Sequence, residues 1–453
     1  MTAALSATVA VSMLFAVPAF ADTQSTGTQT TGSSAQTVQE GSTVKPDANA
    51  QTTEKVTITK DNVKEITGKI TQMTLEQGKA FVDENDCPLL VAGLIGEIYI
   101  HPKTTPEEQK AQTEMVARVA KIAKYAYEKL SDADKKAVPE IPEGYEYPGA
   151  GGADYFSTAA PVGSAAKDKA WTKKVCAAPD KKAEILVVSF GTSFNTSRYQ
   201  TIGGIERAIQ KKYGKKYSVR RAFTSQVIIN HILARDEYKI DTVREALEKA
   251  NKSGVKTLIV QPTTLMSGEE YDLLKANVKA NKGSVKTVKI ASPLLKSDKD
   301  RQTVAKALAS SAAKKAGVKT SALKKSGSKT AFVFIGHGTS HANRVTYTRM
   351  QNDYSKLGYK NVYVGTVEGK PASTSAASII RKLKKKGYKK VVIRGMMVVA
   401  GDHANNDIAG NDSDSWKSQL KKAGFKVSAQ VAGLGSLTSV QNIYVQHTAA
   451  AIK

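Results

Sequence analysis

From residue 181 onward, short apolar runs alternate with amphipathic stretches along the chain. The apolar runs are rich in β-branched residues, and the clearest of them are 184–190, 256–262, 331–337 and 390–399. The amphipathic stretches between them, such as 241–254 and 375–387, have apolar positions at helical spacing. Nearly continuous apolar strands between helices are typical of a parallel sheet that helices cover on both faces. The pattern therefore predicts an α/β fold.

The same order of elements occurs twice in this part of the chain. LVVSFGTS (186–193) and FIGHGTS (334–340) have the same shape, and each is followed by a short strand, a helix, a long strand and a glycine-containing loop. A repeated order of elements indicates an internal duplication. We therefore expect two similar doubly wound parallel-sheet half-domains, at 181–325 and 326–453, with ligands bound at the carboxyl ends of the strands.

A smaller region precedes the repeat. Residues 107–130 have the spacing of a long amphipathic helix, and the apolar stretch 86–100 suits a packing partner for it. Residues 53–145 are therefore predicted to form a small, mainly helical N-terminal region, in which we find no chemical motif. The stretch 146–180 begins with a segment rich in Pro, Gly and Tyr and is predicted to be a linker.

The first residues have the apolar length of a signal peptide and end in Ala-Phe-Ala, which predicts cleavage after Ala21. No basic residue precedes the apolar run, so a membrane anchor remains the alternative. Residues 22–52 are rich in Thr, Ser and Gln and are predicted to be a disordered linker. We expect an exported protein: periplasmic, cell-surface or secreted. Export permits a disulfide, and the sequence leaves open whether Cys87 and Cys176 pair.

The charge balance is strongly basic, with Lys+Arg 67 against Asp+Glu 41 and a formal net charge of +26. Such a surplus indicates attraction to a polyanion, such as an anionic cell surface or a polycarboxylate ligand, and a solvated lysine-rich surface is the alternative. Few aromatic residues accompany the lysine runs, as in 381–390, and no zinc-finger or RNA-binding signature occurs. Nucleic acid is therefore not expected as a partner. The basic stretch 314–329 between the two halves is predicted to be an insert.

Three side chains that could bind a metal ion stand at predicted strand ends of the second half. They are His337, Glu368 and His403, each with glycine beside it or close by. The corresponding positions of the first half are roughly Phe190, Thr224 and Glu270. Two neutral imidazoles and one carboxylate suit a borderline divalent cation such as Co, Fe, Ni or Zn. A hydrogen-bonded loop residue is the alternative for each of them alone.

The remaining histidines and acids nearby receive other roles. His341 is expected at the rim of the site, because Gly338 turns the chain before it, and His231 is expected to pack within an apolar helix. Asp402 or Asp407 could orient an imidazole, although both are equally plausible as loop or helix-cap residues.

At these motifs the sequence resembles a known family. LVVSFGTS, GHGTSHAN, VYVGTVEG and MMVVAGDHANNDIAGNDSDSW occur together and in order, and the resemblance covers about residues 181–453. The family is that of the anaerobic sirohydrochlorin cobaltochelatases, the CbiK-type class II chelatases. The resemblance implies two similar α/β halves with a cleft between them, related to ferrochelatase. It also implies ATP-independent insertion of Co(II) into sirohydrochlorin during cobalamin synthesis.

The resemblance further implies roles for individual residues. His337, Glu368 and His403 match the family's metal site, and His337 also matches its preferred general base. No permanently bound cofactor is expected: the divalent metal is a substrate, with Co(II) favoured and Fe(II) second. The tetrapyrrole carries eight carboxylates, so we expect the positive charge to steer it into the site. Its expected contacts are Ser189, Thr192, Arg220, Arg221, Thr339 and Ser340, with Arg198 and Lys370 as weaker candidates.

Several alternatives remain open at this level. The chain could be a sirohydrochlorin ferrochelatase, or an exported, non-catalytic protein that binds a metal or a haem-like tetrapyrrole. It could also be a basic cell-wall-associated protein that keeps the chelatase fold. A homo-oligomer is compatible with each of these.

Overall fold

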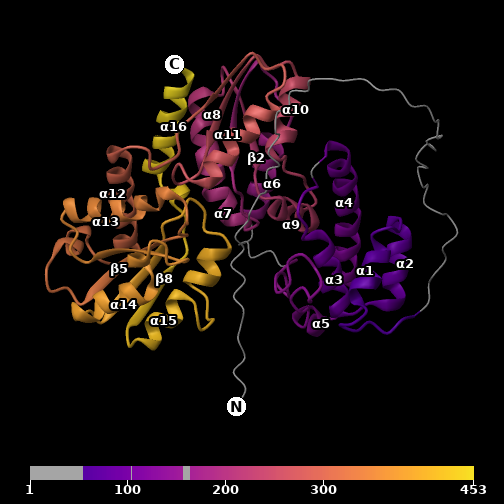
Figure 1. Ribbon diagram of the computed structural model, residues 1–453, viewed down its shortest axis with the longest axis horizontal. Helices are drawn as coiled ribbons and strands as arrows, with labels where there is room; N and C mark the ends of the chain where they lie inside the picture. Colours follow the sequence, from indigo (N-terminus) through magenta and orange to yellow (C-terminus); the bar gives the residue numbers. More distant parts are fainter. Residues whose placement is uncertain (1–54, 104, 157–163) are drawn as a thin grey trace, which may run out of the picture. The chain divides into compact units, whose positions relative to one another are not determined.

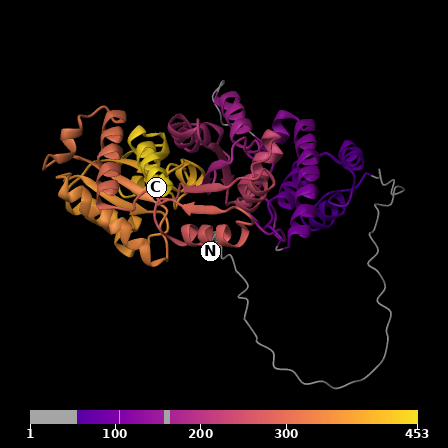
Figure 2. The ribbon, with the colours of Figure 1, turned by 90° about the horizontal axis from the view of Figure 1, so that it is seen from above.

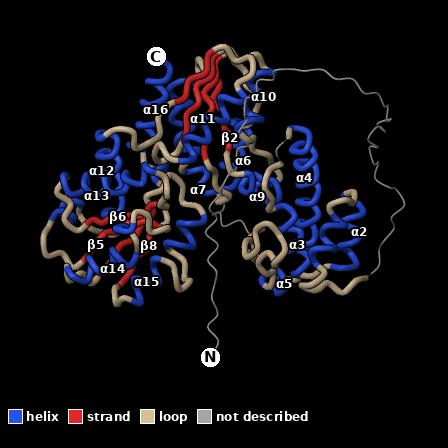
Figure 3. Tube along the Cα trace, viewed as in Figure 1, coloured by secondary structure: helices blue, strands red, loops and turns tan. Residues whose placement is uncertain are grey.

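The computed structural model describes residues 55–156 (except 104) and 164–453, so the predicted signal peptide and the linker at 22–52 lie outside the described residues. Two separate four-stranded parallel sheets form the body (Figures 1 and 3). The strands of the first sheet are β1 (Ala183–Ser189), β2 (Ser218–Phe223), β3 (Thr257–Pro262) and β4 (Thr287–Ile290). Those of the second are β5 (Thr330–Gly336), β6 (Val362–Thr366), β7 (Lys390–Gly395) and β8 (Lys426–Gln430).

The two sheets have the same topology. Their orders are β2-β1-β3-β4 and β6-β5-β7-β8, so the first strand of each half is central and pairs in parallel with the next two. Nearly every position of β1, β2 and β5 is buried, as expected of strands covered on both faces. The predicted α/β fold with two similar parallel-sheet halves is confirmed.

Helices cover both sheets. Those that follow the strands of the first half are α7 (Asn195–Gln200), α8 (Ile202–Tyr213), α9 (Gln226–Asp236), α10 (Val243–Lys252), α11 (Glu269–Asn281) and α12 (Asp298–Lys315). Those of the second half are α13 (Val345–Lys356), α14 (Ala376–Lys385), α15 (Trp416–Lys422) and α16 (Thr438–Ile452), with the π-helical turn Ala404–Ile408 after β7.

The two halves exchange their last helices. On α16, Tyr444 donates a hydrogen bond to the carbonyl of Thr263 at 2.9 Å, and the helix lies beside α8 (Figures 1 and 2). On α12, Arg301 forms an ion pair with Asp353 of α13 at 2.8 Å. The predicted boundary at residue 325 assigns α12 to the first half and α16 to the second. Each of these helices instead packs against the other half. Each helix buries its apolar face where the other half leaves a sheet face uncovered, an arrangement that chain order alone does not indicate.

The N-terminal region has its own helical core. Its helices are α1 (Val63–Ile70), α2 (Leu75–Asn85), α3 (Pro88–Ile98), α4 (Pro106–Lys129) and α5 (Asp132–Lys136), and α4 is the predicted amphipathic helix. The stretch 146–180, predicted to be a linker, is partly built into the fold. Tyr155 and Phe156 join the core of the N-terminal region, and α6 (Ser164–Val175) packs against α7 and β2. Asp168 and Thr172 of α6 are the buried partners of Arg198 and Arg221, and these contacts hold α6 against the body.

Helix α9 carries the contacts between the N-terminal region and the body. Asn230 donates a side-chain hydrogen bond to the carbonyl of Ile98 at 2.9 Å, and Lys124 pairs with Glu237 at 3.1 Å. The ring of His231 stacks on Tyr155 at 4.0 Å, and its Nε2 donates to the Tyr155 carbonyl at 2.7 Å. The expectation that His231 packs within the structure is confirmed.

Acid should weaken this contact through His231. Burial, aided by the charge of Arg235, lowers the pKa of His231 to about 3, whereas an unfolded chain protonates near 6.5. The unfolded state therefore binds an extra proton as the pH falls below 6.5, and the protein should lose about 1.4 kcal/mol of stability per pH unit through this group. Urea unfolding between pH 7 and pH 5 measures the loss. The variant His231→Phe keeps a ring without a titrating group, so its decline should be shallower; parallel declines would contradict the assignment.

Both cysteines are free thiols, so the open question of their pairing is answered for this structure. Burial raises the pKa of the Cys176 thiol to about 11, which keeps it protonated. Among the described residues, no helix has both the length and the apolar character needed to cross a membrane.

Candidate metal centre

The three predicted ligands lie at the carboxyl edge of the second sheet. His337 directly follows β5, Glu368 follows β6, and His403 precedes the π-helical turn after β7. Because β5 pairs with both β6 and β7, the three chain segments emerge side by side. Gly338 makes this approach feasible: its φ is +101°, and a Cβ there would lie 2.9 Å from Cβ of Glu368.

The side chains of these residues contact one another. His337 Nδ1 lies 3.4 Å from Glu368 Oε1, and the imidazoles of His337 and His403 meet edge to face with their centroids 4.5 Å apart. The side chains of His337 and His403 are 42% and 47% exposed, so both rings remain accessible to a metal ion and a substrate. Within the part of the chain that the structure describes, no three His, Cys, Asp or Glu side chains form a ready-made metal-binding group. The three donors are therefore neighbours in space whose side chains do not already converge on one point.

Hydrogen bonds fix the tautomer of both imidazoles. His337 Nδ1 lies 2.9 Å from the carbonyl of Gly338, and His403 Nδ1 lies 2.5 Å from Oδ2 of Asp407. Both partners accept, so each neutral ring carries its hydrogen on Nδ1 and presents the lone pair of Nε2. Nε2 is thus the atom of each ring that can bind a metal ion or accept a proton.

Asp407 orients His403, which confirms one of the two candidates for that role. The residues stand four apart in a helical turn and so lie on one face of it. Burial by itself would lower the pKa of His403, but the hydrogen bond and charge of Asp407 outweigh it, with Asp402 and Glu368 adding, so the pKa is raised. Asp402 instead accepts a hydrogen bond from Asn406 at 2.8 Å.

Helices α7 and α11 of the first half border the site. His341 Nε2 lies 3.6 Å from Oδ2 of Asp272, which agrees with its expected place at the rim. The backbone N–H of Ala400, three residues before His403, donates to Ser197 Oγ at 3.0 Å. Desolvation and the charge of Glu269 raise the pKa of Glu270, and His403 acts against this shift. Glu270 therefore lies close enough to His403 for their charges to interact.

The three arginines predicted to hold substrate carboxylates have another role. Arg221 is fully buried and pairs with Glu206 at 2.7 Å, and Arg220 pairs with Glu184 and Asp241 at 3.1 and 3.0 Å. Arg198 is also fully buried and pairs with Asp168 at 2.6 Å. Their charges are neutralised inside the first half, so the prediction that they contact substrate is wrong.

The four hydroxyl candidates divide between the halves. Ser189 and Thr192 are buried, and Ser189 Oγ already accepts a hydrogen bond from Thr263 at 2.8 Å, so neither side chain faces a substrate. Ser340 is exposed beside the site and accepts a hydrogen bond from Lys370 Nζ at 3.0 Å. Thr339 is partly exposed, and its Oγ1 accepts from the N–H of His341. Thr339, Ser340 and Lys370 therefore remain available as rim contacts.

Two further residues were assigned no role from the sequence. Tyr347 of α13 is buried, and its hydroxyl accepts the N–H of Gly338 at 3.1 Å, which holds the loop that carries His337. Phe190 occupies the place of His337 in the first half and is 39% exposed. Its aromatic character was visible in the repeat, but only the structure shows that the ring is left open to solvent.

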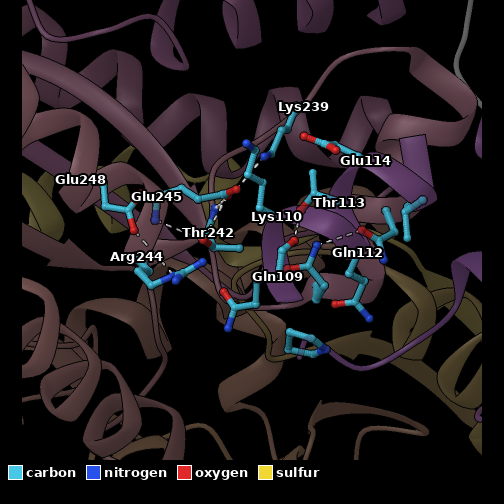
Figure 4. Close-up of a pocket in the computed structure, with 14 residues that line it drawn as sticks. Gln109, Lys110, Gln112, Thr113, Glu114, Lys239, Thr242, Arg244, Glu245 and Glu248 are labelled. Atoms are coloured by element: carbon cyan, nitrogen blue, oxygen red, sulfur yellow. Dashed lines mark hydrogen bonds and ion pairs between the residues drawn. The ribbon is translucent and has the colours of Figure 1, made fainter. Parts of the chain in front are cut away.

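A polar cavity of about 380 Å³ lies away from these residues, between α4 and the segment that includes α9 and α10 (Figure 4). Its charged groups largely neutralise one another: Lys239 pairs with Glu245 at 2.5 Å, and Arg244 lies 3.8 Å from Glu248. None of the three predicted metal ligands lines it.

Comparison with known proteins assigns the duplicated α/β body to the metal chelatases. The chain belongs to the cobalt chelatase (CbiK) family, whose model matches residues 182–453. The sirohydrochlorin cobaltochelatase of Salmonella typhimurium is 30% identical over 266 residues, which are 59% of this chain and 95% of that protein. The sirohydrochlorin cobaltochelatase CbiKC of Nitratidesulfovibrio vulgaris is 30% identical over 276 residues, which are 60% of this chain and 92% of that protein. The resemblance to this family is thus confirmed.

Among solved structures, SirB from Bacillus subtilis with Fe³⁺ is similar over 59% of this chain and 95% of the SirB chain, with 14% sequence identity and a TM-score of 0.42. The sirohydrochlorin chelatase SirB of Bacillus subtilis subspecies spizizenii in complex with cobalt has 11% identity and a TM-score of 0.39. The family match begins after the N-terminal region, at residue 182.

Proposed function

We propose that the chain inserts Co(II) into sirohydrochlorin without ATP, and that His337, Glu368 and His403 bind the metal on its way into the macrocycle. The observation that carries the proposal is the meeting of His337 with Glu368 and His403 at the ends of adjacent strands. Two relatives that share 30% identity across most of their own length are named sirohydrochlorin cobaltochelatases.

The chemistry requires an exchange of charge at the macrocycle. One divalent ion enters and two pyrrole N–H protons leave, so the net charge of the tetrapyrrole is unchanged. His337 presents a lone pair on Nε2, and a neutral imidazole is well suited to accept a proton near neutral pH. We assign it the role of general base as well as ligand. Glu368, 3.4 Å from His337 Nδ1, would stabilise the imidazolium that forms.

Donors that lie close together without forming a converged group suit a metal that passes through. A substrate ion must be released to the macrocycle, whereas a rigid, preformed site would retain it. The exposed ring of Phe190 offers an apolar surface for a flat macrocycle on the side of the first half. Thr339, Ser340 and Lys370 are proposed to contact carboxylates at the rim.

Comparison of Co(II) with Fe(II) tests the metal assignment. Anaerobic insertion is followed by the absorption band of sirohydrochlorin, with each ion supplied in parallel at equal free concentration. The proposal expects faster insertion of Co(II); faster insertion of Fe(II) would assign the chain as a ferrochelatase. Both ions accept imidazole and carboxylate ligands, so the rates rather than the donor set decide between them.

Asp407→Asn should weaken metal binding by about 10- to 100-fold, because it removes the charge that orients His403 while keeping the shape of the side chain. Titration of the protein with Co(II), followed by its d–d absorption, measures the dissociation constant. Asp412→Asn is a matched control in the same loop, since Asp412 is exposed and forms no ion pair with a described residue. Equal constants for the two variants would exclude the proposed role of Asp407.

For the location of the protein, we propose export through the predicted signal peptide with cleavage after Ala21. The N-terminal sequence of the mature protein, purified from the cell envelope or the medium, tests this. A protein that retains residues 1–21 in the cytoplasm would contradict it.

A further inference from the structure

The excess of positive charge is concentrated at one edge of the second sheet. Residues 55–156 carry 13 Lys and Arg against 17 Asp and Glu, so the surplus belongs to the rest of the chain. Around the second sheet, the four segments that lead from a helix into one of its strands contain sixteen lysines and no aspartate or glutamate. We call these segments, 314–329, 356–360, 384–390 and 421–426, the lysine face. All sixteen lysines are exposed.

Backbone hydrogen bonds show that the four segments are contiguous. The N–H groups of Lys389 and Lys390 both donate to the carbonyl of Lys329 at 2.9 Å, and the N–H of Lys426 donates to the carbonyl of Lys389 at 3.0 Å. The N–H of Lys360 donates to the carbonyl of Leu323 at 3.0 Å. The lysines therefore form one surface rather than four separate loops.

Most charges of this surface are not neutralised locally, although the charge of Lys356 acts on Asp298. Among the described residues, no carboxylate forms an ion pair with any of the sixteen lysines. Some lysines of the first half do form such pairs: Lys181 pairs with Asp180 and Lys249 with Asp241, each at 2.7 Å. Sixteen exposed and adjacent positive charges repel one another, so an anionic partner that covers them would be strongly favoured.

The lysine face cannot steer a tetrapyrrole into the metal centre. Its segments enter the strands at their amino ends, whereas His337 and its neighbours follow the carboxyl ends at the opposite edge of the sheet. The carboxyl edge carries Glu368 and Asp402, and a charge separated by more than a Debye length of about 8 Å is largely screened. These sixteen lysines therefore do not serve the substrate site.

We propose that the lysine face docks the protein on an anionic lipid bilayer. The four segments contain lysine but no arginine, and their tyrosines, Tyr359 and Tyr388, are buried, so they offer neither bidentate phosphate clamps nor stacking surfaces for nucleic acid. Val318 lies among these lysines with 37% of its surface exposed, and an apolar side chain within a basic surface suits contact with lipid. Docked in this way, the protein turns the carboxyl edge with the metal centre away from the bilayer.

Sedimentation of the full chain with vesicles tests the proposal. The vesicles contain equal parts of phosphatidylcholine and phosphatidylglycerol, with pure phosphatidylcholine as the uncharged reference. The test variant replaces Lys329, Lys385, Lys389 and Lys426 by glutamine. The matched control replaces Lys60, Lys110, Lys121 and Lys136 of the N-terminal region, which are also exposed, so both variants lose the same charge. Metal insertion by each variant reports that the body remains folded.

We expect the test variant to bind anionic vesicles about 100-fold more weakly than the wild type, and the control to bind within a few-fold of it. Added salt should weaken the wild type in the same assay. Equal losses in the two variants would overturn the proposal, because net charge alone would then explain binding. Val318→Ser separates lipid from other polyanions: it should weaken binding to vesicles a few-fold and leave binding to soluble polyphosphate unchanged. Tight binding to polyphosphate or duplex DNA without binding to vesicles would also overturn it.

Discussion

Replacement of His337 by alanine is expected to lower the rate of metal insertion by about 100-fold to 10,000-fold, the range that a positioned general base typically contributes. The variant removes the Nε2 lone pair, and with it both a metal ligand and the acceptor of a pyrrole proton. Binding of the tetrapyrrole should stay within a few-fold of the wild type, because the imidazole is one small part of the contact surface. Insertion kinetics under anaerobic conditions measure the rate, and quenching of substrate fluorescence measures the affinity.

His341→Ala is the control for this experiment. It removes the same residue type from the same loop, but His341 contacts Asp272 at the rim and not the other ligands. Its insertion rate should stay within a few-fold of the wild type. If His337→Ala were as active as His341→Ala, the assignment of His337 as base and ligand would be wrong.

Arg221→Leu is expected to destabilise the protein by about 3–5 kcal/mol, because it leaves the fully buried carboxylate of Glu206 without its partner. Arg221 donates to both oxygens of Glu206 at 2.7 Å and to Thr172 of α6 at 2.8 Å, so its loss also removes one of the contacts between α6 and β2. The midpoint of urea unfolding measures the change. A substrate contact would behave differently, with normal stability and a raised KM.

The double variant Arg221→Leu/Glu206→Leu separates these causes. Removing both charges eliminates the unpaired carboxylate, and apolar replacement of a buried ion pair is often neutral or stabilising. Most of the lost stability should therefore return. If the double variant were no more stable than Arg221→Leu, the cost would come from packing and not from the buried charge.

The sheet and its duplication could be predicted from sequence because both depend on local patterns. A strand buried on both faces must be apolar along its length, and β1 and β5 are. The exchange of α12 and α16 could not be predicted, since it depends on which sheet face remains uncovered once the other helices have packed. Helix α6 was missed because its buried positions, among the side chains that the structure describes, are Asp168, Thr172 and Val175, and these do not form an apolar stripe.

The meeting of His337, Glu368 and His403 could be predicted because strand order brings the ends of β5, β6 and β7 together, whatever the conformation of the loops. The substrate contacts were predicted less well. Arg220 and Arg221 lie on β2, where a charged side chain in a buried strand signals either a ligand or an internal ion pair. Glu184 and Glu206, their partners, stand 36 and 15 residues away, and no spacing rule connects them. The direction of each arginine is decided by packing that only the structure contains.

The number of metal atoms that each protein molecule inserts tests the central claim most directly. The wild-type chain is supplied with excess sirohydrochlorin and Co(II) without oxygen or ATP, and the metallated product is counted against protein, with His337→Ala in parallel. The account predicts many product molecules per protein for the wild type and a large loss in the variant. Product that stops at one equivalent per protein would contradict the account, because it would indicate a binding protein. Equal turnover in the two proteins would also contradict it, because the proton acceptor and metal ligand would then be residues other than His337.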